Sequence, residues 1–183
     1  MKQTAKLEHG LIHIYTGEGK GKTTAGLGLC LRAAGSGMQV LIARFLKTND
    51  SAELDAFSRF PNVEIVANEK SFGFSKVWKN DPEIKGDATR YYSAMLEEAI
   101  ARIETGTYDV LMLDEILASV QLGVVDQEKL LAFLRNKPEK LEVILTGRGP
   151  IPELVELADY VSEIKKIKHP FDAGILARKG IEY

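Results

Sequence analysis

The stretch YTGEGKGKTTAG, residues 15–26, follows the apolar run LIHI at residues 11–14 and contains four glycines and two lysines. Closely spaced glycines let successive backbone N–H groups face one anion, and a helix that begins after them adds the positive end of its dipole. The apolar run predicts a buried strand, and residues 22–37 have the spacing of a helix. The stretch therefore predicts a phosphate-binding loop between a strand and a helix.

The general pattern of such loops is G-x-x-x-x-G-K-[ST]. Residues 21–23 match its second half, whereas Thr16 occupies the position of the first glycine. Lys22 is expected to reach the phosphate oxygens, the Thr23 hydroxyl to bind Mg²⁺, and Lys20 to add a second cation. A glycine-rich turn without a ligand is the alternative, which the strand and helix around the loop disfavour. The residues expected to hold the phosphates are Gly17, Glu18, Gly19, Lys20, Gly21, Lys22, Thr23 and Thr24.

An acidic pair ends the apolar stretch DVLMLDE, residues 109–115. Because ligands of parallel sheets lie beyond the carboxyl ends of the strands, we expect Asp114 to face the phosphates and to join the Mg²⁺ shell, directly or through water. Glu115 has three open roles: a base, a metal partner or a ribose contact. An acidic pair taken alone could also be a solvated strand end, but the phosphate-binding loop favours the metal.

A further strand-to-loop turn, LTGRGP at residues 145–150, carries Arg148 between two glycines. Arginine presents a planar fork of donors that suits phosphate oxygens. We expect Arg148 at the same edge of the sheet as the loop, with an ordinary surface arginine as the alternative.

Short apolar runs alternate with segments of helical period along the chain. This alternation predicts an α/β fold, a mainly parallel doubly wound sheet with helices on both faces, of the phosphate-loop NTPase (RecA-like) type. We expect residues 11–183 to form one domain after a polar N-terminal segment, residues 1–10, and residues 70–86 to form a loop with room for one helical turn. The predicted strands are 11–15, 39–45, 63–67, 109–115, 141–147 and 173–183, and the predicted helices are 22–37, 89–104, 126–138 and 151–161.

Composition restricts the cellular setting. The formal net charge of −2 argues against nonspecific binding to nucleic acid or to an acidic membrane surface. No apolar run approaches the ~20 residues that cross a bilayer, and the N-terminus lacks the apolar core of a signal peptide. The single cysteine, Cys30, predicts a buried apolar residue in a reducing compartment. We therefore expect a cytoplasmic protein.

The residues alone leave the reaction open, because phosphate-binding loops serve hydrolases, kinases, motors and transferases. Several stretches together resemble one family, the ATP:corrinoid adenosyltransferases, and span residues 15–183. These stretches are TGEGKGKTTAGLG, RFLK, GF, YDVLMLDEI, VILTGRGP, ELADYVSEIKKIKHPFDAG and ARKGIEY. The resemblance implies three substrates or cofactors: ATP, Mg²⁺ (or Mn²⁺) and a corrinoid.

The resemblance also implies a mechanism in which a Co(I) corrinoid attacks C5′ of the ribose and expels the whole triphosphate. ATP would then lie reversed relative to most phosphate-loop enzymes. Lys22, Glu115 and Arg148 inherit catalytic roles from this resemblance. A hydrolase that uses Glu115 as its base, and a noncatalytic nucleotide-binding or corrinoid-carrying module, are the other readings.

Aromatic residues near the corrinoid displace its lower axial ligand in this family. The GF at residues 73–74 gives this role to Phe74. The family tryptophan is expected at position 76, which is lysine here, so either Trp78 serves or the aromatic wall is altered. Packing of these rings with Phe72 in a small satellite core is the alternative. In DEIL, residues 114–117, an apolar leucine replaces a polar amide of relatives, which leaves the nucleoside contacts there open.

Partners follow from the resemblance as well. Production of Co(I) requires an electron donor, such as a flavodoxin-like reductant, and relatives are often dimers, so a homodimer is allowed. The basic cluster Lys165, Lys166 and Lys168 is either a solvated face or a contact for an acidic electron donor.

Overall fold

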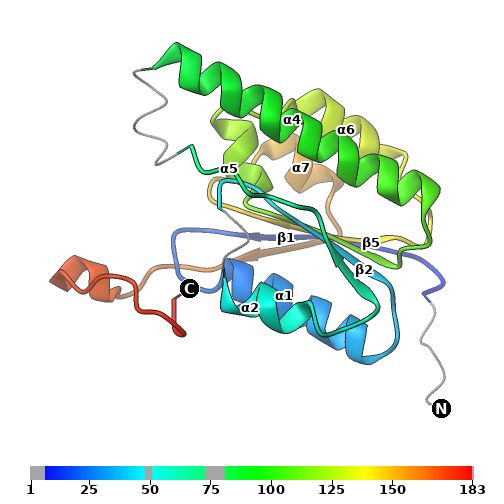
Figure 1. Ribbon diagram of the computed structural model, residues 1–183, viewed down its shortest axis with the longest axis horizontal. Helices are drawn as coiled ribbons and strands as arrows, with labels where there is room; N and C mark the ends of the chain where they lie inside the picture. The colour runs from blue at the N-terminus through cyan, green and yellow to red at the C-terminus, as the bar shows by residue number, and fades with distance from the viewer. Residues whose placement is uncertain (1–6, 48–50, 73–80, 183) are drawn as a thin grey trace.

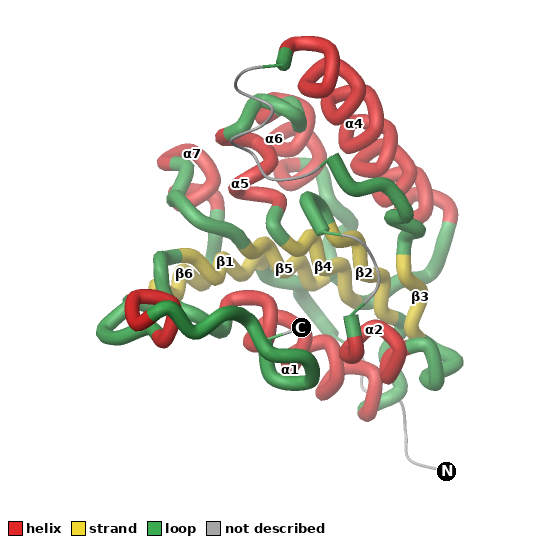
Figure 2. The backbone as a smooth tube through the Cα atoms, turned by 60° about the vertical axis from the view of Figure 1, so that its left-hand side comes forward, coloured by secondary structure: helices red, strands yellow, loops and turns green. Residues whose placement is uncertain are grey.

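A single sheet organises the computed structural model, which describes residues 7–47, 51–72 and 81–182. Within these residues six strands occur in the order β3-β2-β4-β5-β1-β6, and every neighbouring pair is parallel (Figure 2). This confirms the predicted α/β fold with a parallel sheet. The strands are β1 (Ile12–Thr16), β2 (Val40–Arg44), β3 (Val63–Ile65), β4 (Val110–Asp114), β5 (Glu142–Thr146) and β6 (Tyr160–Glu163).

Helices cover both faces of the sheet, as the doubly wound prediction requires (Figure 1). Helices α1 (Lys22–Gly35) and α2 (Ala52–Phe57) lie on one face. The opposite face carries α4 (Pro82–Thr105), α5 (Ile116–Gln121), α6 (Gln127–Arg135) and α7 (Pro152–Leu157), while a 3₁₀ turn, η1 (Pro170–Ala173), lies in the C-terminal segment. Within the described residues, no helix combines the length and apolar character that a membrane span requires.

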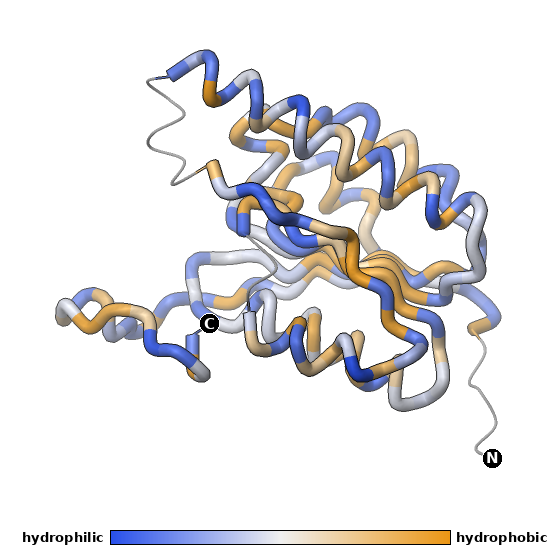
Figure 3. Tube along the Cα trace, viewed as in Figure 1, coloured by the Kyte–Doolittle hydropathy of each residue, from blue (hydrophilic) through white to orange (hydrophobic). Residues whose placement is uncertain are grey.

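The central strands are apolar on both sides because helices pack on both sides. Every residue of β2 and β4 is buried, and Figure 3 shows the hydrophobic residues concentrated along the strands. Successive side chains alternate between two hydrophobic layers: Leu111 and Leu113 face the layer under α4, while Val110 and Met112 face the layer under α1. The same alternation directs Asp114 to the α1 side.

Helix α1 lies very close to the sheet at one glycine. A Cβ atom added at Gly26 would lie 2.7 Å from Cε of Met112 on β4. One turn further along, Cys30 Sγ contacts Met112 Sδ at 3.6 Å, and burial raises the pKa of the Cys30 thiol to about 12. The prediction that Cys30 is a buried apolar residue is confirmed.

Helix α4 begins at Pro82 rather than Thr89, so the last five positions of the predicted loop at residues 70–86 belong to this long helix and not to a loop with one separate helical turn. The Asp81 side chain accepts hydrogen bonds from two amides of the first turn and caps the helix. Gly86 suggested a break, but a glycine destabilises a helix interior by only about 1 kcal/mol.

The predicted helix at residues 151–161 ends early, because α7 ends at Leu157 and β6 follows it. Strand β6 pairs with β1, and the Asp159 carboxylate accepts a hydrogen bond from Ile12 N at 2.8 Å. Tertiary pairing with β1 therefore outweighs the helical spacing of this segment.

The predicted final strand is wrong for the part of residues 173–183 that the structure describes. Residues 173–182 contain the end of η1 and turns. Helices α2 and α5 were not predicted, since six residues are too few for a helical period to be recognised.

Candidate active site at the carboxyl edge of the sheet

A cleft of about 300 Å³ lies beyond the carboxyl ends of the central strands, where parallel α/β sheets bind their ligands. The loop after β1 forms one wall, and the ends of β2 and β4 with the turn after β5 face it. The C-terminal segment closes one side. The lining residues are Glu18, Gly19, Lys20, Gly21, Lys22, Thr23, Thr24, Arg44, Lys47, Glu53, Glu115, Arg148, His169, Ala177, Ile181 and Glu182.

The phosphate-binding loop wraps around its own lysine. Lys22 Nζ donates hydrogen bonds to Gly17 O at 2.8 Å and to Gly19 O at 2.9 Å. Burial is the main reason that the pKa of Lys22 lies below its ordinary value; Glu115 opposes this shift, and the charge of Arg148 adds to it. The ammonium group is thus held inside the loop, where an incoming anion would meet it.

The loop satisfies its need for glycine at positions that differ from the general pattern. Gly17 has φ 104°, and a Cβ atom there would lie 2.5 Å from Ile164 O. At Gly19 a Cβ atom would lie 2.7 Å from the same oxygen, and Gly19 N donates to Ile164 O at 2.7 Å. Thr16, which occupies the position of the first glycine in the general pattern, belongs to β1. The absence of a glycine there therefore leaves the loop itself unaffected.

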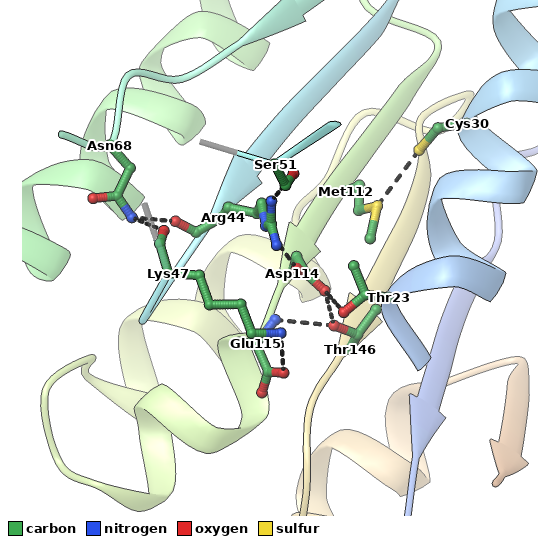
Figure 4. A network of polar contacts seen from close by, with 10 residues as sticks. All are labelled: Thr23, Cys30, Arg44, Lys47, Ser51, Asn68, Met112, Asp114, Glu115 and Thr146. Carbon is green, nitrogen blue, oxygen red and sulfur yellow. Dashed lines mark hydrogen bonds and ion pairs between the residues drawn. The ribbon is translucent and has the colours of Figure 1, made fainter. Parts of the chain in front are cut away.

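Asp114 lies at the centre of the polar network that Figure 4 shows. It is fully buried, and its Oδ1 accepts hydrogen bonds from the Thr23 hydroxyl at 2.8 Å and the Thr146 hydroxyl at 2.6 Å. Thr146 also accepts a hydrogen bond from Glu115 N at 2.9 Å. The structure therefore brings the two predicted metal-binding residues into contact and adds Thr146, which sequence reasoning missed.

Arg44 is a second residue that sequence reasoning missed. It lies directly opposite Asp114 in the register of β2 and β4, so both side chains point to the same face of the sheet. Its Nε lies 3.2 Å from Asp114 Oδ2, its guanidinium also bonds the Ser51 hydroxyl, and its side chain is only 8% exposed. The available signal was the arginine in RFLK, which lies near the end of the predicted strand at residues 39–45.

Glu115 pairs with a cation as well. Its Oε1 accepts a hydrogen bond from Lys47 Nζ at 2.9 Å, and its backbone has φ 60°, which is rare for a residue other than glycine. Asn68, from the segment after β3, donates to the backbone oxygens of Arg44 and Lys47. Sequence reasoning missed Lys47 and Asn68.

Arg148 lines the cleft, as predicted, from the turn after β5. Its Nη1 lies 3.2 Å from Glu18 Oε2 of the phosphate-binding loop, and both side chains are about two-thirds exposed. The pair connects the loop after β1 with the loop after β5 across the edge of the sheet.

The C-terminal segment reaches the same loop. Lys20 Nζ lies 3.3 Å from Ile181 O and 3.8 Å from Glu182 Oε1, and Arg178 bonds the Glu182 carboxylate. These contacts hold the pKa of Glu182 at about 2, chiefly through the hydrogen bonds from Arg178. Figure 1 shows the C-terminus beside the start of α1.

The predicted aromatic residues Phe74 and Trp78 lie outside the described residues. Phe72 is described, and its ring packs against Tyr91 and Tyr92 of α4 with centroids 5.6 and 5.7 Å away. Phe72 is therefore a packing residue, as the alternative interpretation of these aromatic residues predicted for it. Leu117 is fully buried in the core, so its side chain offers no contact to a nucleoside.

The arrangement fits a divalent cation shared with phosphate groups. Thr23 supplies a hydroxyl oxygen and Asp114 a carboxylate. Among the residues that the structure describes, Asp114 Oδ2 is buried and accepts no hydrogen bond, and Arg44 Nε pairs with it at 3.2 Å. Mg²⁺ prefers oxygen ligands and is commonly held by one or two carboxylates plus substrate phosphates and water. The loop, its lysine and this carboxylate together suit a nucleoside triphosphate with its metal.

Comparison with known proteins points to one family. The family model for the ATP:corrinoid adenosyltransferases BtuR/CobO/CobP matches residues 8–183. The corrinoid adenosyltransferase of Pseudomonas aeruginosa is 33% identical over 184 residues, covering 98% of this chain and 86% of the relative. That of Escherichia coli K12 is 34% identical over 180 residues, with 98% and 88% covered. CobA of Salmonella typhimurium is 33% identical, with the same coverage.

A solved structure supports the fold alone. ATPases 2 and 3 of EssC from Geobacillus thermodenitrificans match with a TM-score of 0.51 at 20% identity, covering 94% of this chain and 35% of that chain.

Proposed function

Because this chain belongs to the ATP:corrinoid adenosyltransferase family, we propose that it transfers the 5′-deoxyadenosyl group of ATP to the Co(I) centre of a corrinoid and releases triphosphate. The observation that carries the proposal is the cleft lined by the phosphate-binding loop, in which the lining residue Thr23 donates a hydrogen bond to the buried Asp114 carboxylate. Residues 11–183 act in this proposal as one catalytic domain, with residues 1–10 as an N-terminal segment in a cytoplasmic protein.

The reaction places the growing charge on the phosphates. Co(I) donates an electron pair to C5′, a cobalt–carbon bond forms, and the C5′–O bond breaks with its electrons leaving on the triphosphate. Donors that are preorganised around the leaving group stabilise the transition state more than the ground state. Lys20, Lys22 and the amides of residues 17–23 perform this function in the proposal, and Arg148 assists from the facing loop.

Thr23 and Asp114 would hold Mg²⁺, or Mn²⁺ in its place. When bound, the cation neutralises charge on the polyphosphate oxygens. Thr146 fixes the orientation of the Asp114 carboxylate through its hydrogen bond to Oδ1. Glu115 orients the nucleotide in this proposal.

The corrinoid side of the proposal involves residues 73–80. Phe74 and Trp78 line the corrinoid and displace its lower axial ligand, which makes Co(II) easier to reduce. A flavodoxin-like electron donor supplies the electron, and the protein acts as a homodimer without a nucleic-acid or membrane partner. These proposals follow from the family and from the aromatic residues of this stretch.

Anaerobic incubation with cob(I)alamin, ATP and Mg²⁺ tests the activity. We expect the absorption spectrum of an adenosylated corrinoid and the release of inorganic triphosphate in equal amount. Release of ADP and phosphate without an adenosylated corrinoid would identify a hydrolase with Glu115 as its base. Binding of ATP without any product would identify a noncatalytic module.

A further inference from the structure

The turn that begins at the last residue of β2, residues 44–47, is held in an unusual conformation by one asparagine. Leu46 in its middle has φ 62°, a conformation that leucine rarely adopts. Asn68 is 1% exposed, and its Nδ2 lies 2.6 Å from Arg44 O and 2.7 Å from Lys47 O. Because backbone oxygens only accept hydrogen bonds, the amide nitrogen of Asn68 must face them. Its two N–H groups therefore connect both ends of the turn.

This turn presents two cations to two acids. Arg44, at its start, contacts Asp114, and Lys47, at its end, contacts Glu115. Figure 4 shows Asn68 at one side of the turn and the acidic pair at the other. Asp114, the last residue of β4, and Glu115, directly after it, are thus each paired with a cation from the segment of residues 44–47.

The two cations differ in their freedom to move. The Arg44 side chain is 8% exposed and is also bonded by Ser51, whereas the Lys47 side chain is 45% exposed. Lys47 lines the same cleft as Lys22, and its charge contributes to the lowered pKa of Lys22. An ammonium on a flexible stem can exchange one anion for another within its reach. Lys47 therefore has both the position and the freedom to contact a polyphosphate.

We propose that Lys47 is a further triphosphate-binding residue and that Asn68 is the residue that positions it. This inference deepens the proposed function and rests on it. In the structure the Lys47 ammonium bonds Glu115. When the polyphosphate enters, the ammonium turns toward the phosphate oxygens, and the Asn68 amide keeps the turn in the conformation from which it can reach them.

Binding of inorganic triphosphate, measured by titration calorimetry with and without Mg²⁺, tests the role of Lys47. We expect Lys47→Gln to weaken binding by about tenfold, as for a lost hydrogen bond to a charged group. Lys47→Arg keeps the charge and should retain most of the affinity. Lys129→Gln, which breaks an exposed ion pair with Glu97 on the far side of the sheet, is the matched control. Equal affinity of Lys47→Gln and wild type would overturn the proposal.

A second asparagine provides the control for Asn68. Asn62 also donates its amide to two backbone oxygens, those of Ala34 and Met38, away from the cleft. We expect Asn68→Ala to weaken triphosphate binding by about tenfold, while Asn62→Ala leaves binding unchanged even where it lowers stability. Equal effects of the two substitutions on affinity would reduce Asn68 to a structural residue and contradict its positioning role.

A double-mutant cycle connects the two residues. If Asn68 acts through Lys47, Asn68→Ala should have little further effect on affinity in the Lys47→Gln background. Additive losses would contradict the positioning role. Where Asn68→Ala fails to fold, Leu46→Gly in the same chain should restore folding, because glycine adopts this φ without the amide. Triphosphate binding needs no corrinoid and no turnover, so these results stand apart from the test of adenosyl transfer.

Discussion

Lys22 connects the structure of the loop with its proposed chemistry at the scale of one residue. We expect Lys22→Ala to lower the rate of adenosyl transfer by about 10²–10³-fold, the range for loss of one preorganised transition-state donor. Among the described residues, its ammonium donates hydrogen bonds only to Gly17 O and Gly19 O of its own loop, so the fold should survive. Initial rates with cob(I)alamin measure adenosyl transfer, and a thermal melt measures whether the fold is retained. A near wild-type rate would remove the lysine from the mechanism.

A substitution at Phe74 can distinguish an effect on the reduction of Co(II) from an effect on adenosyl transfer. Because it is proposed to displace the axial ligand of Co(II), Phe74→Ala should slow adenosylation that starts from Co(II) by about tenfold or more, with a smaller effect from chemically prepared Co(I). Phe72→Leu is the control for packing, because the Phe72 ring packs on α4. Equal losses from Co(I) and Co(II) would assign Phe74 to packing instead.

At the scale of elements, Glu142 couples β5 to β1. Its carboxylate accepts hydrogen bonds from Leu11 N at 2.7 Å and from His13 Nε2 at 2.5 Å. Burial by itself raises the pKa of Glu142, but the hydrogen bonds from His13 and Leu11 outweigh it, so the pKa lies below its ordinary value. A carboxyl with a lowered folded-state pKa adds stability above its ordinary pKa of 4.5 and loses it as the pH falls through the lowered value.

We therefore expect Glu142→Gln to reduce the free energy of unfolding by about 1–3 kcal/mol at neutral pH. The difference from wild type should shrink as the pH is lowered below 4.5 toward the lowered pKa. Urea unfolding at several pH values measures this. Glu139→Gln, an exposed carboxylate nearby, controls for the change of charge. A difference that stays constant with pH would show that the ionised carboxylate does not stabilise the pairing of the strands.

The elements also show which parts of the structure a sequence can predict. The phosphate-binding loop, Asp114 and Arg148 were predicted to meet because each lies at the end of an apolar run, and parallel strands end at one edge. Arg44 and Thr146 were missed, since their contacts depend on which strands flank β4, and apolar runs do not encode that order. Asn68 was missed because its bonds depend on the conformation of the turn after β2.

At the scale of the whole molecule, the phosphate-binding loop near the start of the chain meets the segment that follows β6, far away in the sequence. Gly19 N bonds Ile164 O, just after β6, and Lys20 contacts the segment that ends at Glu182. The segment that follows the edge strand β6 therefore contacts the phosphate-binding loop and restricts its conformation. A substitution that moves the phosphate-binding loop away from this segment should weaken ligand binding, although it removes no ligand-binding side chain.

Gly19→Ala makes that separation. Its Cβ atom would lie 2.7 Å from the backbone oxygens of Ile164 and Lys165, so the loop must shift away from the segment after β6. We expect triphosphate affinity to fall by about tenfold to a hundredfold, because a displacement near 1 Å can have effects of that size. Gly28→Ala is the control: a Cβ atom there meets no atom within 4 Å, so affinity should hold while the helix gains about 1 kcal/mol of stability. Calorimetric titration of both variants decides, and unchanged affinity in Gly19→Ala would mean that the C-terminal segment does not shape the loop.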